Sequence, residues 1–125
     1  TLAQKAVMPA FRDDSFIQTY MKKYDNRRRY AYDLFNSIPG VSMQMPEAGF
    51  FVWIDVSQLG DSSEITDLLT KDALVSANDG KFYGDMGNGH LRLIDGCFWK
   101  DEDSYAAMDR MAATFRKLAK KKGLC

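Results

Sequence analysis

The sequence has little cysteine, histidine or proline. It contains two cysteines, Cys97 and Cys125, and a single histidine, His90, among 125 residues. Two cysteines are too few for the framework of a disulfide-rich secreted domain, and the three side chains lack the spacing of a zinc site. We therefore expect a protein of a reducing compartment, the cytoplasm, that folds by burying a hydrophobic core.

A charge imbalance and long apolar runs are also missing. Lys and Arg together number 17, as do Asp and Glu, so the formal net charge at pH 7 is zero. A neutral chain without a run of about 20 apolar residues favours neither nucleic acid nor a membrane as a partner. The hydrophobic fraction of 46% is enough for the core of one domain.

Apolar residues at helical spacing predict several helices. Leu2–Met8 looks helical, and Pro9 should interrupt it because a proline ring clashes with the preceding turn. The longest predicted helix covers residues 14–38. A short helix should begin at an Asp61 cap, and a final helix at an Asp101 cap.

Four β-prone runs lie between these helices, at residues 41–45, 50–56, 73–77 and 90–94. The second run is nearly all apolar and should be a central, covered strand. Residues 78–89 are rich in Gly, Asp and Asn and should form a loop. The order after the long helix is then β-β-α-β-β-α, which predicts a two-layer α+β domain with helices packed on one face of a small mixed or antiparallel sheet.

The most informative residue is Arg92, which follows the glycine-rich loop and lies between two apolar residues of the last strand. Leu91 and Leu93 should face the side opposite Arg92 because side chains alternate along a strand. A guanidinium presented in this way can bind a carboxylate through two parallel hydrogen bonds. On the pattern alone, the simpler alternative is a surface ion pair between Arg92 and a nearby Asp.

A basic cluster lies on the long helix at Lys22, Lys23 and Arg27–Arg29. Asp25 and Asp33 are interleaved with it. We therefore expect a solvated or subunit-facing helix surface here, rather than a site for nucleic acid.

Several segments, in this order, resemble a known enzyme family. Residues 24–28 (YDNRR) and 38–40 (IPG) resemble the helix that joins the large and small domains of class I and II aminotransferases. Residues 46–55 (PEAGFFVWID) resemble their P-x-G-(G/A)-F-(F/Y)-(L/V)-W-(V/I)-D strand. Residues 80–84 (GKFYG) and 87–93 (GNGHLRL) resemble their P-G-x-x-F-G…G-x-G-x-(L/V/I)-R-(L/I/V) segment. These enzymes depend on pyridoxal 5'-phosphate (PLP) and have fold type I, the aspartate aminotransferase fold.

The resemblance implies roles for several residues. Arg92 matches the family arginine that binds the substrate α-carboxylate, whereas Gly80, Tyr83 and Gly84 match loop positions of mainly conformational importance near the active-site mouth. No lysine here lies in the family's S-x-K type motif, so the lysine that holds PLP is expected outside this chain. We expect no catalytic, cofactor-binding or metal-binding residue within it.

The resemblance also implies an organisation. Residues 1–12 would be the tail end of the large PLP domain and residues 13–125 the C-terminal small domain, which closes the active site. The partners would be amino acid and 2-oxo acid substrates, the remaining large domain and a second copy in a homodimer. The fragment alone is expected to be inactive.

Two departures leave the reaction open. Asp79 stands where the family usually has proline, and Asn78-Asp79-Gly80 is closer to the related PLP-dependent carbon–sulfur (cystathionine-type) β-lyases. Ile94–Trp99 matches neither group well. An aminotransferase is the favoured interpretation, and the alternatives are such a β-lyase or a non-catalytic carboxylate-binding module of the same architecture.

Overall fold

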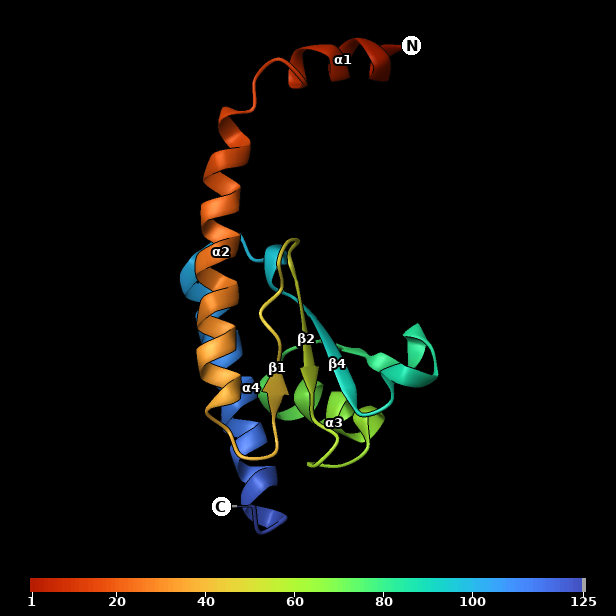
Figure 1. Ribbon diagram of the computed structural model, residues 1–125, viewed down its shortest axis with the longest axis vertical. Helices are drawn as coiled ribbons and strands as arrows, with labels where there is room; N and C mark the ends of the chain where they lie inside the picture. The colour runs from red at the N-terminus through yellow and green to blue at the C-terminus, as the bar shows by residue number, and fades with distance from the viewer. Residues whose placement is uncertain (125) are drawn as a thin grey trace.

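The computed structural model describes residues 1–124, so Cys125 lies outside the described residues (Figure 1). The α-helices are α1 (Leu2–Ala10), α2 (Ser15–Asn36), α3 (Ser62–Leu68) and α4 (Asp101–Lys121). The strands are β1 (Ser42–Met43), β2 (Phe51–Asp55), β3 (Asn78–Asp79) and β4 (His90–Ile94). None of the helices within residues 1–124 has the length and apolar content needed to cross a membrane.

The sheet has the strand order β1-β2-β4-β3, and every neighbouring pair is antiparallel. At its centre, the register of β2 and β4 places Trp53 opposite Arg92 and Asp55 opposite His90. On the other side of β4, Asn78 of β3 lies opposite the same arginine. Asn78, Arg92 and Trp53 therefore form one row across three strands.

Helices cover one face of this sheet and leave the other open. Figure 1 shows α2 (orange) and α4 (blue) running together along the molecule, and these two helices pack against each other. The inward-facing residues of the two central strands are at most 2% exposed, and they are Val52, Ile54, Leu91 and Leu93. They share one core with Phe35 of α2, Ile65 of α3 and Phe115 of α4. The predicted two-layer α+β architecture is confirmed, as are the orientations of Leu91 and Leu93.

The third predicted strand is wrong. Residues 69–73 form a single π-helical turn, and Leu74 then adopts a left-handed conformation with φ of 53°. Burial does alternate here, because Ala73 and Val75 are buried while Leu74 is 77% exposed. Alternation alone does not make a strand, since pairing with β4 begins only at Asn78.

Proline does not interrupt the first helix as expected. Helix α1 continues through Pro9 to Ala10, and the amide of Phe11 still donates to the carbonyl of Val7 at 3.0 Å. Pro9 lies next to the last residue of α1, so the hydrogen bond that its nitrogen cannot donate is lost at the helix end, not in its middle. None of the residues of α1 is buried, and the helix projects away from the rest of the chain in Figure 1.

Arg27 departs from the solvated or subunit-facing surface expected for the basic cluster, because it is buried. Its side chain is 1% exposed, its Nε and Nη2 lie 2.8 and 2.7 Å from Asp101 Oδ1, and its Nη1 donates to the Asp95 carbonyl oxygen at 2.8 Å. Asp101 is the first residue of α4, so the prediction that it caps this helix is wrong. Arg28 and Arg29, in contrast, form ion pairs within α2.

Candidate functional site

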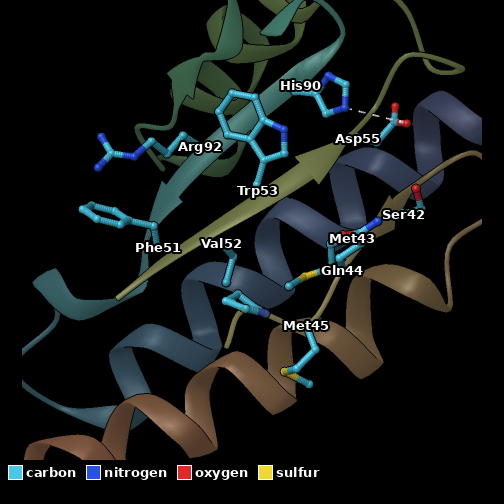
Figure 2. A pocket seen from close by; sticks show the side chains of 11 residues that line it. Ser42, Met43, Gln44, Met45, Phe51, Val52, Trp53, Asp55, His90 and Arg92 are labelled. Atoms are coloured by element: carbon cyan, nitrogen blue, oxygen red, sulfur yellow. Dashed lines mark ion pairs between the residues drawn. The ribbon is translucent and has the colours of Figure 1, made fainter. Parts of the chain in front are cut away.

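The open face of the sheet carries polar and aromatic side chains. Phe51, Trp53 and Asp55 alternate outward from β2, as do His90 and Arg92 from β4. Figure 2 shows them on the side away from the helices, whereas Val52 and Met43 point toward the helices. A cavity of about 550 Å³ extends over this face from Arg92 to β1.

Arg92 lies at one end of the cavity and is held by aromatic side chains. Its Cζ is 3.6 Å from the centre of the Phe51 ring and 5.1 Å from that of Tyr83. A guanidinium over an aromatic face is stabilised by the ring quadrupole, without loss of its charge. Within residues 1–124 no carboxylate oxygen lies in ion-pair range of Arg92. The simpler alternative, a surface ion pair between this arginine and a nearby aspartate, is therefore wrong for the part of the chain that the structure describes.

Tyr83 and Asn78 complete the surroundings of Arg92. The Tyr83 hydroxyl oxygen accepts a hydrogen bond from Asn78 Nδ2 and another from Arg92 Nη1, each at 2.8 Å. These two hydrogen bonds, that of Asn78 first, lower the pKa of Tyr83. The Tyr83 ring packs edge-on against Trp53, with centroids 5.8 Å apart at 79°. The arginine is thus fixed by a row of side chains that crosses the sheet.

A close backbone contact shapes the loop that carries Tyr83. Gly80 begins a 3₁₀ turn that ends at Tyr83, and a Cβ at Gly80 would overlap the carbonyl oxygen of Gly87. Only glycine permits two backbone segments to approach so closely. Gly80 and Gly87 therefore have a conformational role in this loop.

Asp79 has a structural explanation where the family usually has proline. It is 8% exposed, and its carboxylate accepts hydrogen bonds from the hydroxyls of Ser62 and Ser63 and from the amide of Lys81. Burial raises the pKa of Asp79, but these hydrogen bonds outweigh burial and hold the pKa below its ordinary value. Asp79 thereby ties the start of the loop to helix α3.

His90 and Asp55 lie at the far end of the cavity from Phe51. The His90 ring stacks on Trp53 with centroids 5.4 Å apart, and its Nε2 is 3.9 Å from Asp55 Oδ2. Its Nδ1 lies 3.1 Å from the Asn88 carbonyl oxygen, which favours the tautomer with a proton on Nδ1. This end of the cavity therefore carries a polar histidine–aspartate pair, while the other end carries the Arg92 guanidinium, which has no acidic partner within residues 1–124.

Comparison with known proteins identifies the family. The family model described as "Aminotransferase class I and II" matches residues 1–94. The chain belongs to the class I and II aminotransferase family. The resemblance expected from the sequence motifs is thus confirmed.

Two relatives show how similar this chain is in sequence to known proteins and how much of each it covers. The aspartate aminotransferase of Musicola paradisiaca is 33% identical over 99 residues, which cover 77% of this chain and 24% of that protein. The cystathionine beta-lyase PatB of Bacillus subtilis is 34% identical over 80 residues, covering 63% of this chain and 20% of that protein. This chain therefore spans about a quarter of the length of these aminotransferase-family relatives.

Solved structures agree with the fold. The alanine aminotransferase from Pyrococcus furiosus superimposes with a TM-score of 0.74 at 28% identity, over 84% of this chain and 27% of that one. Cystalysin from Treponema denticola, whose structure contains PLP, also gives a TM-score of 0.74, at 20% identity over 97% of this chain and 30% of that one. Both therefore contain a segment with the architecture of this aminotransferase-family chain.

The lysines of the described residues lie outside the cavity beside Arg92. Within residues 1–124 the cavity beside Arg92 is not lined by any lysine. Lys81, two residues from Tyr83, is hydrogen-bonded to Asp61 and Ser63 instead. The cavity lining within residues 1–124 therefore contains a guanidinium but no primary amine.

The sequence analysis named Arg92 and Tyr83 but did not place Phe51, Trp53 or Asn78 around the arginine. Strand alternation alone places Phe51 and Trp53 on one face of β2, so that signal was present in the sequence. The register that brings Trp53 opposite Arg92 could not be read from either strand alone. The contact between Tyr83 and Arg92 depends on the path of a loop, for which periodicity gives no signal.

Proposed function

We propose that residues 13–125 are the small domain of a PLP-dependent aminotransferase acting on amino acids and 2-oxo acids, and that residues 1–12 are the tail end of its large domain. The observation that carries the proposal is Arg92, a cation without an acidic partner in the described chain, on the open face of a sheet from this family. The absence of buried residues in α1 supports a role for that segment outside the small domain.

In this proposal Arg92 binds the α-carboxylate of the substrate. Phe51 and Tyr83 fix the position of the guanidinium, so the substrate finds a donor that is already oriented. Two parallel hydrogen bonds to a carboxylate also fix the direction of the bond to the substrate Cα. Arg92 thus orients the reacting carbon, and closure of the small domain would keep water from it.

The whole enzyme would contain PLP, which supplies an electron sink for the carbanion formed at the substrate Cα. The lysine that holds PLP and acts as general base would lie outside this chain. The remaining large domain and a second copy in a homodimer would complete the active site, and the cytoplasm would be its compartment. The chain alone would then be inactive.

Substitution of Arg92 in the whole enzyme tests this function. Loss of a charge-assisted bidentate contact should raise KM for amino acid substrates at least about tenfold in Arg92→Ala, since such a contact contributes roughly 1.5–3 kcal/mol. Arg29→Ala, which removes another arginine from the surface of α2, should leave KM unchanged. A KM for Arg92→Ala within about twofold of the unsubstituted enzyme would remove Arg92 from this role.

A second candidate is a carbon–sulfur β-lyase. The 34% identity to PatB and the Asn78-Asp79-Gly80 segment favour it. The two reactions differ in products, because a lyase releases pyruvate and ammonia from cystathionine, whereas an aminotransferase passes the amino group to a 2-oxo acid. Assay of the whole enzyme for ammonia and for the new amino acid therefore decides between them.

A non-catalytic module is the third interpretation. Such a module would bind 2-oxo acids or amino acids through Arg92 without the rest of an enzyme. Calorimetry on the chain alone distinguishes it, because tight binding of a keto acid would favour the module. We expect no tight binding, since an open face on which Arg92 is the one unpaired arginine within residues 1–124 leaves most of a ligand in water.

A further inference from the structure

We propose that the hydroxyl of Tyr83 donates a hydrogen bond to the carboxylate that Arg92 binds, which makes Tyr83 a second carboxylate-binding residue. The inference rests on the function proposed above and adds a ligand contact to the same site. The resemblance to the family gives this loop position a mainly conformational role.

The hydrogen bonds of Tyr83 leave its proton unused. Its oxygen accepts from Asn78 Nδ2 and from Arg92 Nη1, both at 2.8 Å. A phenol also has one O–H to donate, and residues 1–124 provide no acceptor for it. Both neighbours are donors, so the free proton must point away from them. Tyr83 is 48% exposed, so this proton faces solvent, and an anion bound beside Arg92 could accept it in place of water.

The hydroxyl is held in place before any ligand arrives. Trp53 packs edge-on against the Tyr83 ring, and Asn78 is the cross-strand neighbour of Arg92. The Gly80–Gly87 contact closes the turn that ends at Tyr83. A preorganised donor loses little conformational freedom when it binds, so most of its hydrogen-bond energy contributes to affinity.

The donors available match the acceptors of a carboxylate. A guanidinium has five N–H groups, and Arg92 uses one of them on Tyr83. A carboxylate has two oxygens with about four acceptor positions, so it can take two hydrogen bonds from Arg92 and one from Tyr83. The hydrogen bonds that Tyr83 accepts also lower its pKa, which makes its hydroxyl a stronger donor.

This arrangement selects a chemical class of ligand. An ionised carboxylate presents only acceptors, whereas a primary amide of the same size would turn an NH₂ group toward Tyr83 or Arg92. Two donors facing each other leave at least one of them without a partner. The site should therefore bind free carboxylates and reject the corresponding amides.

The test measures binding of benzoate and succinate, which are unreactive carboxylates, to the whole enzyme by calorimetry, with benzamide as the comparison ligand. Tyr83→Phe keeps the ring and its contact with Trp53 and removes only the hydroxyl. We expect it to weaken carboxylate binding roughly tenfold or more and to leave the weak binding of benzamide unchanged. The matched control, Tyr32→Phe, removes the hydroxyl of a tyrosine of α2 that does not line the cavity, and it should change binding by less than about twofold.

Arg92→Lys separates direct contact from positioning, because lysine keeps the charge but lacks the fixed guanidinium geometry. If Tyr83 touches the ligand, Tyr83→Phe should weaken benzoate binding in the Arg92→Lys enzyme as well. An effect confined to the enzyme with Arg92 would mean that Tyr83 acts only through the arginine, and it would overturn the inference.

The binding results that would overturn the role of Tyr83 differ from those that would overturn the proposed function. Carboxylate binding within about twofold of normal in Tyr83→Phe, together with a large loss in Arg92→Ala, would overturn only the inference. No loss in Arg92→Ala would overturn the proposed function. Circular dichroism on each variant checks that the comparison is made between folded proteins.

Discussion

Arg27 and Asp101 form an ion pair with Nη2 and Oδ1 2.7 Å apart, which joins α2 to the start of α4. The arginine is 1% exposed and the aspartate 31% exposed, so the positive charge is the more deeply buried partner. The same guanidinium holds the carbonyl oxygen of Asp95, three residues beyond Arg92. The ion pair and this hydrogen bond therefore fix the end of β4, the strand that presents the proposed carboxylate site.

Arg27→Ala should strongly destabilise the chain. The substitution opens a cavity and leaves the Asp95 carbonyl without its donor, and breaking a buried ion pair costs about 3–5 kcal/mol in general. Because Asp101 can be partly solvated, we expect a loss near the lower end, about 3 kcal/mol in the free energy of unfolding. Urea denaturation measures it.

The matched control for Arg27 is on the same helix. Arg29 pairs with Asp25 four residues away but is 65% exposed. Arg29→Ala should change stability by about 0.5 kcal/mol or less, as is typical of exposed helix pairs. Equal effects of the two substitutions would mean that burial of Arg27 is unimportant.

Asp95 should make the chain less stable as the pH rises. Asp95 is fully buried, and neither of its carboxylate oxygens has a hydrogen-bond partner within residues 1–124. Burial raises its pKa from 3.8 to about 6, although the positive charges of Arg27 and Arg28 act to lower it. The folded state therefore keeps a proton that the unfolded state releases. This contribution to stability is complete below about pH 4 and is lost as the pH rises to about 6.

Asp95→Asn should remove this pH dependence. The variant stays neutral, so it should be more stable than the unsubstituted chain above about pH 6, by up to about 3 kcal/mol, and should lose that advantage near pH 4. Urea denaturation of both chains across this range measures the difference. Asp33→Asn, at an exposed position of α2, serves as control and should show no such trend. A constant difference at every pH would refute a raised pKa at Asp95.

Helices α2 and α4 illustrate what the sequence could and could not predict. Arg27 looks like Arg28 and Arg29 in the sequence, because its partner Asp101 lies 74 residues later. Local patterns do predict β2 and β4, since a covered strand must be apolar on its inner face whatever its neighbours are. Long-range partners, loop paths and strand register depend on how the elements pack, so a local pattern cannot specify them.

Gly80→Ala should destabilise the loop that carries Tyr83. The added Cβ would overlap the Gly87 carbonyl oxygen and lie 2.7 Å from the His90 carbonyl oxygen. Both obstacles are backbone atoms, which cannot rotate away as a side chain would, so we expect a loss of about 1–3 kcal/mol. Thermal unfolding measures it, and Lys81→Ala, at the next residue, should cost about 1 kcal/mol or less because Lys81 forms a surface pair. Equal melting temperatures for Gly80→Ala and the unsubstituted chain would show that the contact is not needed.

The chain of 125 residues alone should not form a specific covalent adduct with PLP. A lysine that attaches the cofactor must lie in a pocket that also holds the ring and phosphate, and the cavity beside Arg92 has no lysine in its lining within the described part of the chain. Addition of PLP, reduction with borohydride and peptide mass spectrometry should find only low labelling spread over exposed lysines. The same treatment of the urea-unfolded chain is the control and should give a similar pattern, because no folded pocket directs the labelling. Stoichiometric labelling of one lysine in the folded chain alone, accompanied by activity, would place the attachment site within these residues and overturn the small-domain assignment.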